Sequence, residues 1–549
     1  MGAAPPIDGP IEVVKNLLMR IAHGPGIFLL SLLVGCGGSQ ISANDHAAAE
    51  PKKKPTTEPA PMIAIEPGEV IELAGEAGSF SAALAAPSGK ERFVVIVASS
   101  KFDDASSEGP AAYRYRFLDA PASRVSEPKK VECAVPADRW RSIANAAKSA
   151  PNDDLSAGPR PNAAPPVKPG ATRVFSWRAR RGTLSVTARA VAVGESTVVW
   201  ADQTPHHEAI LDAAFVTEFQ RDFETLILPR ARSVFGGESD IDGDGRIALF
   251  FSPMTRIAAT VAFFSGCDLT PSGACPGSNQ GEVLYLTPPN AIDPPYNTPR
   301  AMKEILAHEL EHLLHHNRKV VRNGLAHDPD SAYLLEGFGA LAQDVLGFQA
   351  GNLYVTKAGL DEVGKLSIGA LLAEGAEYDR SRDGALRGGA YLFVRWLYDQ
   401  AGGDAVGNGN AIEDRGGPSL VRALLDAKGS VASEIPRVGG APLGDLAMDF
   451  FTALALSNRG LRVLPCFSYL PAVPDPVTGR QRGADLFASF HGMRMEGVRM
   501  QPARDADGDL SPGGVDHLVI EADGRPGPIT FTVAVDAAAL PRVRVARIE

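Results

Sequence analysis

The sequence contains no pair of cysteines with the CxxC spacing of a structural zinc site, although it has five cysteines in 549 residues. It shows no internal repeat of solenoid length, and no apolar run after the amino-terminal region is long enough to span a bilayer. Positive charge is not in excess, because the formal net charge is -11, which argues against a nucleic-acid partner. With 44% hydrophobic and 22% charged residues, the chain has the composition of a globular protein of about two to four domains.

The most informative stretch is Ala307–His312, which reads AHELEH and contains the pattern HExxH. Histidines four residues apart share one face of a helix, so the ring nitrogens of His308 and His312 can converge on one metal ion. Glu309 then lies beside the metal, where it can take a proton from a water that the cation has acidified. The pattern predicts a zinc hydrolase.

Local context predicts that this pattern lies on a helix with a buried face. Thr298 can cap the helix, and Pro299 suits its first position. Apolar residues recur at helical spacing at Met302, Ile305, Leu306, Leu313 and Leu314. The alternative is a solvated, charged helix whose histidines bind nothing.

The same residues allow one other order of roles. The string also reads HxxEH, the inverted motif, in which Glu311 would be the base. A metzincin would need a glycine and a third histidine where the chain has His315 and Arg318, which excludes that class.

Zinc needs a third protein ligand, and Glu336 is the candidate. It lies among small and apolar residues at the start of a second predicted helix, where an unpaired charge would be costly. Asp344, eight residues later, is the candidate acceptor that would orient a ligand histidine, with an ordinary surface aspartate as the alternative. The rival ligands are other histidines nearby, His315, His316 and His327.

HELEH followed by LLEGFGALAQD resembles the arrangement of the gluzincins, and more narrowly that of the hyicolysin-type neutral metallopeptidases. The similarity covers roughly the middle half of the chain and includes other blocks in order, Phe235–Ile247, Phe263–Leu269, Ser278–Leu286 and Gly389–Leu397. HExxH occurs in many families, whereas the ordered set of blocks is more specific. The resemblance implies a zincin-like metallopeptidase core.

The resemblance also assigns roles residue by residue. His308 and His312 correspond to metal ligands, and Glu309 corresponds to the general base. Glu336 matches the glutamate of the downstream EG block, which favours the direct order of the motif over the inverted one.

A hydrogen-bond donor for the oxyanion of the transition state is also implied by the resemblance. The candidate is Tyr391, with Tyr378 as the alternative, although an aromatic residue on a helix also serves simply to pack a core. The chain departs from the family pattern at Gly388 and Gly389, where a bulkier residue is expected.

The amino terminus resembles a bacterial lipoprotein signal peptide. A short apolar run leads into Leu33–Cys36, which resembles a lipobox, and Met19 is a candidate start. We expect lipidation of Cys36, with a plain signal peptide or a buried helix as alternatives. The protein would then be exported and anchored to a membrane of the cell envelope, and Gly37 points to the outer membrane; an extracellular location is the other expectation.

Cysteine usage agrees with export. After Cys36, four cysteines remain, enough for two bridges in an oxidising compartment. Cys267 and Cys275 flank a short loop and are the expected pair. Cys133 with Cys466 follows only by elimination.

Hydrophobic periodicity predicts an α+β protein with five regions. They are a signal peptide (1–36), a flexible tether (37–61), a β-rich module (62–204), a zinc metallopeptidase domain (205–460) and a small β-rich region (461–549). The clearest predicted elements are strands at 93–97, 183–191 and 531–535 and an amphipathic helix at 390–401.

Two acidic stretches resemble calcium loops. The first has Asp240, Asp242 and Asp244, but Phe251 occupies the place of the final acidic ligand. The second contains alternating aspartates and a further one at the twelfth place, namely Asp505, Asp507, Asp509 and Asp516, but it lacks the turn glycine. A calcium ion would be structural, and polar turns that bind no ion are the alternative.

These features favour a zinc endopeptidase that hydrolyses a protein or peptide substrate. A zinc aminopeptidase is a weaker alternative, because no GxMEN-like block that would hold a free amine precedes the motif. An inactive surface-binding lipoprotein on a peptidase scaffold is the third alternative, against which the intact motif argues.

Overall fold

The computed structural model describes residues 62–102, 112–119, 125–136, 138–140, 142–143, 167–179, 182–258, 261–294, 296–349, 352–373, 382–407, 410–490, 492–504 and 506–549. These residues form a mixed α and β protein with a β-rich amino-terminal part, as predicted. The predicted signal peptide, Cys36 and the tether lie outside the described residues, as do Tyr378 and Asp505.

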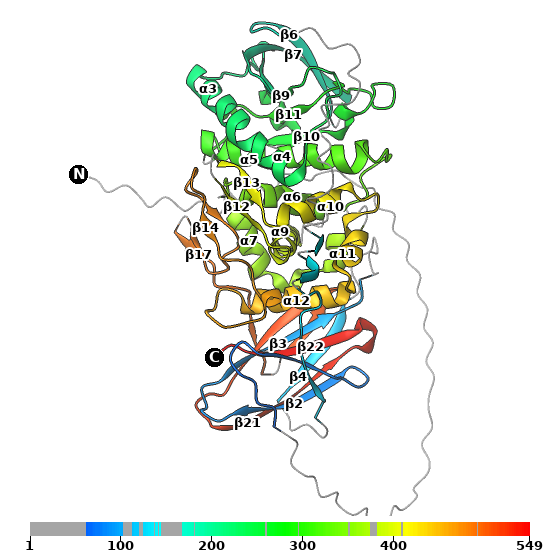
Figure 1. Ribbon diagram of the computed structural model, residues 1–549, viewed down its shortest axis with the longest axis vertical. Helices are drawn as coiled ribbons and strands as arrows, with labels where there is room; N and C mark the ends of the chain where they lie inside the picture. Colours follow the sequence, from blue (N-terminus) through cyan, green and yellow to red (C-terminus); the bar gives the residue numbers. More distant parts are fainter. Residues whose placement is uncertain are drawn as a thin grey trace, which may run out of the picture. The chain divides into compact units, whose positions relative to one another are not determined.

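Two sheets pack face to face in the lower part of Figure 1. The six-stranded sheet has the order β18 (Gln501–Pro502), β20 (Val515–Glu521), β3 (Arg92–Ser99), β22 (Pro541–Arg547), β1 (Val70–Leu73) and β5 (Pro128–Lys130). The four-stranded sheet has the order β19 (Asp507–Leu510), β4 (Tyr113–Leu118), β21 (Gly527–Val535) and β2 (Ser79–Ala86). Apolar side chains from both sheets form one core between them.

Strand β3 explains why this region reads as an unbroken apolar run. Val95 and Val97 face the core between the two sheets, whereas Val94 and Ile96 face the helices. A strand covered on both faces needs apolar residues at every position. The strands predicted at 93–97, 183–191 and 531–535 are confirmed as parts of β3, β7 and β21.

Strand pairing crosses the region boundaries drawn from the sequence. In β3, Val95 lies opposite both Leu518 of β20 and Val545 of β22, so strands from 62–204 and 461–549 share one sheet. Strands β6 to β8, predicted to belong to the amino-terminal module, instead join the sheet of the middle region. Alternation of side chains reveals a strand but not its partner, because pairing depends on contacts between residues far apart in sequence.

A second six-stranded sheet belongs to the middle region. Its order is β10 (Ala262–Phe264), β11 (Val283–Leu286), β9 (Ile247–Phe251), β8 (Thr197–Asp202), β7 (Gly182–Val193) and β6 (Thr172–Ala179). Strand β9 pairs in parallel with β8 and β11, whereas β10 lies antiparallel at the edge. One face carries an aromatic cluster with Phe175, Trp200 and Phe250, and the other packs on helices.

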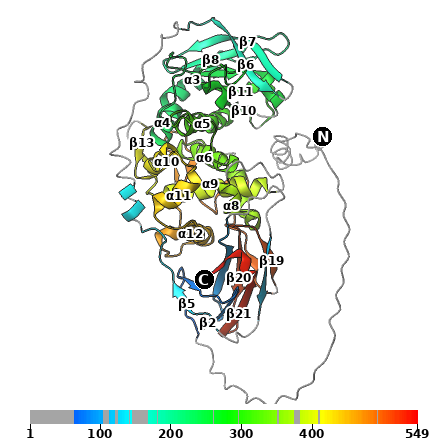
Figure 2. The same ribbon diagram turned by 90° about the vertical axis from the view of Figure 1, so that its right-hand side faces the viewer.

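The helices lie between the mixed sheet and the two packed sheets in both views (Figures 1 and 2). They are α3 (Ala213–Asp222), α4 (Leu228–Phe235), α5 (Pro299–His316), α6 (Ala332–Val345), α7 (Asn352–Asp361), α8 (Ile368–Leu372), α9 (Asp383–Gln400), α10 (Gly417–Asp426), α11 (Val431–Gly439) and α12 (Leu443–Leu456). Two-stranded sheets are formed by β12 (Asp404–Val406) with β13 (Ile412–Asp414), β14 (Val473–Pro474) with β15 (Gln481–Arg482), and β16 (Ser489–Phe490) with β17 (Met493–Arg494). Within the described ranges, no helix combines the length and hydropathy required to cross a bilayer.

Two disulfide bonds link the four cysteines of the described part. Cys267 is bonded to Cys275, as expected from the loop that separates them. Cys133 is bonded to Cys466 across 333 residues, the pairing reached by elimination. The long-range bond connects the segment after β5 with the segment after α12.

Removal of residues 501–549 should abolish cooperative folding of the remaining chain. The deletion exposes β3, whose side chains from Phe93 to Val97 are fully buried. Each contributes about 1.5–3 kcal/mol, a total comparable with the roughly 5–15 kcal/mol that stabilises a whole domain. We expect loss of the near-ultraviolet circular dichroism signal and of a sharp thermal transition. A truncated chain that keeps both would show that the carboxy-terminal strands form a separate module.

Candidate metal centre

Helix α5 carries the HELEH stretch, and its start follows the sequence prediction. The Thr298 Oγ1 accepts a hydrogen bond from the Ala301 amide at 3.2 Å, and Pro299 occupies the first helical position. Leu306 and Leu310 are fully buried on the side that packs into the core. His308, Glu309 and His312 are only partly buried, so they line a face that water can reach.

His308, His312 and Glu336 converge from α5 and α6. Each offers one nitrogen or oxygen atom, and these atoms all lie within 4.8 Å of one another. The His308 Nε2 and Glu336 Oε2 atoms are 3.3 Å apart. A single ion could therefore contact all three side chains, and two imidazoles with one carboxylate are ligands typical of zinc.

A glycine makes room for this arrangement. A Cβ atom at Gly339, one turn along α6 from Glu336, would lie 2.6 Å from the His308 Cε1 atom. Any larger residue would push the imidazole out of place. At Gly337 a Cβ would lie 2.9 Å from the Ala390 backbone, so this glycine permits close packing of α6 on α9.

Arg387 of α9 is the cation of the site that sequence reasoning missed. Its Nη1 donates to the Glu336 Oε2 at 3.0 Å. Burial alone would raise the pKa of Glu336, but the charge of Arg387 and the contact with His308 hold it well below its usual range. Burial opposes protonation of His308, yet Glu336 outweighs it and raises the His308 pKa to about 9. A metal would replace that proton.

Glu309 lies at the edge of the mixed sheet. Its Oε2 accepts a hydrogen bond from the Phe264 amide of β10 at 3.1 Å. Burial raises the pKa of Glu309, although His312 and His308 oppose the shift. A carboxylate with a raised pKa holds a proton more readily than an exposed one, which suits a general base.

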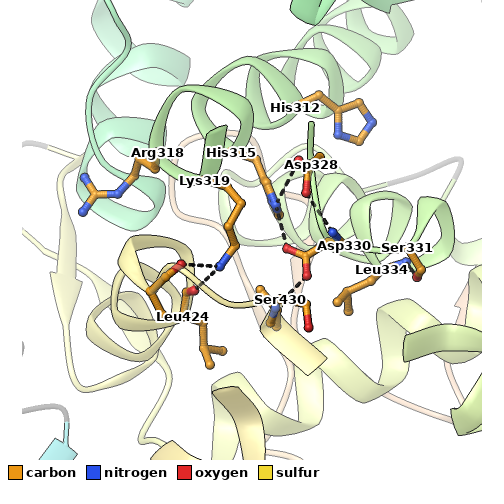
Figure 3. A network of polar contacts seen from close by, with 12 residues as sticks. His312, His315, Arg318, Lys319, Asp328, Asp330, Ser331, Leu334, Leu424 and Ser430 are labelled. Carbon is orange, nitrogen blue, oxygen red and sulfur yellow. Dashed lines mark hydrogen bonds and ion pairs between the residues drawn. The ribbon is translucent and has the colours of Figure 1, made fainter. Parts of the chain in front are cut away.

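Glu311 orients His312 and lies on the buried side of α5. Its Oε2 accepts from the His312 Nδ1 at 3.0 Å, and its Oε1 accepts from the His315 Nδ1 at 3.2 Å. The His315 Nε2 in turn donates to the Asp330 Oδ2 at 3.2 Å (Figure 3). Because Nδ1 of His312 is engaged, Nε2 is the nitrogen that remains for a metal, as in other sites where a carboxylate supports a ligand histidine.

The carboxylates around His315 favour its charged form. Burial opposes protonation, but hydrogen bonds to Asp330 and Glu311 raise the His315 pKa to about 10. Hydrogen bonds with His312 and His315 lower the pKa of Glu311 against the effect of burial. Figure 3 shows Lys319 beside this network, where its ammonium group donates to the carbonyl oxygens of Leu424, Ala427 and Gly429.

This geometry disfavours the inverted motif. Glu311 is fully buried, and both of its carboxylate oxygens bind histidines, so it cannot serve a water at an open site. Glu309 is the carboxylate on the accessible face.

The rival histidines do not join His308 and His312. His315 points to Asp328 and Asp330, with which it forms a second group that could hold an ion. The imidazole of His316 packs against Gly266 and lies 5.7 Å from the Phe264 ring; burial and the charge of His315 lower its pKa to about 4. His327 is exposed.

Asp344 is not the acceptor for a ligand histidine. It is buried, and its Oδ2 accepts from the Tyr391 hydroxyl at 3.0 Å and from the Arg395 Nη1 at 2.7 Å. Its Oδ1 accepts from the Gly483 amide. Asp344 lies eight residues after Glu336 on α6, so the two side chains share a helix face only approximately. In the structure, Asp344 faces α9 instead of α5.

Tyr391 does not fit the role of an oxyanion donor. Its side chain is fully buried, and its hydroxyl donates to Asp344 and accepts from the Gln349 amide. The predicted amphipathic helix proves to be α9, which is buried on nearly all sides. Gly388 and Gly389 allow this burial, because a Cβ at Gly388 would lie 2.2 Å from the Val355 carbonyl oxygen of α7.

The two acidic stretches differ in structure. Asp240, Asp242 and Asp244 converge, with one oxygen from each within 4.8 Å of the others. In contrast, Asp507 and Asp509 lie in β19, where their carboxylates approach Arg116 and Arg114 of β4, and Asp516 lies in β20. These aspartates, predicted to form a calcium loop, therefore lie in strands instead. Cross-strand pairs with arginine stabilise the extended conformation.

No protein-family model matches the chain, and the curated proteins compared with it include no match. The assignment of the site therefore depends on its geometry and on the motif.

Glu311→Gln should weaken metal binding by about 10–100-fold, because His312 loses a charged acceptor for its Nδ1. The affinity is measured by competition with a chromophoric zinc chelator. Asp344→Asn is the matched control: it removes a buried carboxylate from the α9 network, so it should lower the melting temperature and leave the metal affinity unchanged. The reverse outcome, with affinity lost in Asp344→Asn and kept in Glu311→Gln, would contradict the assigned hydrogen bonds.

Proposed function

We propose that the protein is a zinc-dependent endopeptidase of the gluzincin type with a zincin-like core. The observation that supports it best is the convergence of His308, His312 and Glu336 within 4.8 Å, with Glu309 next to them on α5. The resemblance to hyicolysin-type metallopeptidases points to the same residues. In this proposal the mixed sheet, α5 and α6 make up the catalytic core.

The donor set suits zinc better than other common metals. Two imidazole nitrogens and one carboxylate oxygen are the ligands of many catalytic zinc sites, which keep a further position open. Zinc held in such a set acidifies water and polarises a carbonyl group. The raised His308 pKa means that the ion must displace a proton from Nε2.

The chain's own residues supply the remaining steps. Glu309 takes a proton from water on a carboxylate oxygen and delivers it to the amine that leaves when the peptide bond breaks. The Phe264 amide holds the Oε2 of Glu309 in place. Glu311 keeps His312 in one orientation, and Arg387 does the same for Glu336.

An extended peptide fits the surroundings of Glu309. In the described part of the chain, β10 lies at one edge of the mixed sheet, and its Phe264 contacts the proposed base. A substrate in extended conformation could align with such an edge through main-chain hydrogen bonds, which do not depend on the side chains of the substrate. This geometry favours internal peptide bonds over the free amino terminus that an aminopeptidase must hold.

We also propose that the protein acts outside the cytoplasm, anchored through lipid on Cys36. Two disulfide bonds in the described part agree with an oxidising compartment.

Glu309→Gln should keep zinc but lower turnover by about two to four orders of magnitude, because a base that is not a ligand can be removed without opening the metal site.

Glu336→Ala should lose both zinc and activity, because it removes one of three protein ligands. Metal content and cleavage of casein are measured side by side, with Glu362→Gln, at a partly exposed position, as the control. Full turnover in Glu309→Gln, or stoichiometric zinc in Glu336→Ala, would refute the assigned roles.

A further inference from the structure

The loop between α4 and β9 gathers three carboxylates at a distance in sequence from the metal centre. Asp240, Asp242 and Asp244 alternate along this loop, and Gly243 and Gly245 adopt positive φ angles of 73° and 69° that let it turn tightly. The spacing matches the first half of an EF-hand-like calcium loop. The twelfth position of that loop, where a bidentate acid belongs, is Phe251, which is fully buried in β9.

A fourth carboxylate reaches the loop from another element. Glu282 directly precedes β11 and is only 3% exposed. Its Oε1 accepts hydrogen bonds from the Ser239 hydroxyl at 2.5 Å and from the Ile241 amide at 3.1 Å. These two residues flank Asp240, so the carboxylate of Glu282 is held against the acidic loop itself.

The other oxygen of Glu282 has no partner. Its Oε2 is buried and makes no hydrogen bond. The neighbouring Gly281 lies against Asp242, because a Cβ atom there would be 2.7 Å from the Asp242 Oδ2. An unpaired, buried carboxylate oxygen beside further carboxylates is costly unless a cation binds there.

Protein cations compensate only part of this negative charge. The Arg173 Nη1 lies 3.5 Å from the Asp242 Oδ2. Burial, with repulsion from Asp242, raises the pKa of Glu282 to about 7. Burial and repulsion from Asp242 also raise the pKa of Asp244 to about 6. Burial is the larger cause of both shifts and repulsion from Asp242 adds to it, whereas Arg246 opposes the shift of Asp244.

We propose that Asp240, Asp242, Asp244 and Glu282 bind one calcium ion, with Glu282 supplying the acidic ligand that Phe251 cannot supply. Calcium prefers sets of carboxylate and other oxygen ligands, and the three converging aspartates and Glu282 all offer carboxylate oxygens. The missing acid of the loop thus comes from a residue more than thirty positions later in the chain.

The calcium site stabilises structure and takes no part in the chemistry of the metal centre. The Asn317 Nδ2, just after α5, donates to the Gly237 carbonyl at 2.9 Å, which ties the loop to the end of the motif helix. Glu282 leads into β11, which pairs with β10. The ion would join these segments, so its loss should lower the melting temperature. This site remains testable even if the proposed peptidase activity fails.

The test is calorimetric titration of the calcium-depleted full chain with calcium chloride, with one equivalent of zinc present throughout. The wild type should bind one calcium ion with a dissociation constant on the order of 10⁻⁴ M or lower, and its melting temperature should rise with calcium concentration. Glu282→Gln should bind calcium at least about tenfold more weakly and lose the thermal shift. Asp242→Asn, at a partly exposed position, should show the same loss if Glu282→Gln does not fold.

Asp509→Asn is the matched control, because Asp509 lies in β19 beside Arg114 and should leave calcium binding unchanged. The proposal is overturned if the wild type binds no calcium. It is overturned as well if both Glu282→Gln and Asp242→Asn bind calcium with the affinity of the wild type. It is also overturned if magnesium gives the same affinity and thermal shift as calcium.

Discussion

The packing of α5 on α6 is the constraint on which the candidate metal centre depends. It places two histidines of one helix opposite a carboxylate of the next, and Gly339 leaves room for the imidazole of His308, whose Nε2 lies 3.3 Å from the Glu336 Oε2. Close packing fixes side chains more firmly than hydrogen bonds on a mobile surface would. The arrangement of this candidate metal site is thus a consequence of how the core is packed.

Buried charge sets the second constraint. Burying an ionised carboxylate without a partner costs free energy. Arg387 offsets this cost for Glu336, and His312 and His315 offset it for Glu311. Two of these contacts, Arg387 with Glu336 and Glu311 with His312, also hold candidate ligands in one orientation. In the proposed function, the second glutamate of HELEH therefore supports a ligand, whereas the first is the base.

The sequence predicts well whatever depends on local spacing. The helix start at Thr298, the shared face of His308 and His312 and the strand at β3 all follow from short-range periodicity. Glu336 could be identified because its charge stood among apolar residues. The short disulfide pair also followed from its loop.

Features that depend on distant residues were missed or assigned wrongly. The contacts of Arg387 and Glu282 join segments far apart in sequence, and no local sequence pattern predicts such contacts. The family resemblance makes Tyr391 a candidate donor, but its side chain is fully buried in α9, as in the alternative in which it packs the core. Strand partners could not be predicted for the same reason, since β3 pairs with strands from the other end of the chain.

The central claim is that one ion binds between α5 and α6, and anomalous diffraction from a crystal of the zinc-loaded protein tests it most directly. Data collected on both sides of the zinc absorption edge should give one strong peak within about 2.0–2.2 Å of a nitrogen of His308, a nitrogen of His312 and a carboxylate oxygen of Glu336. A peak instead among His315, Asp328 and Asp330, the other group near this helix that could hold an ion, would contradict the account. So would the absence of any zinc peak.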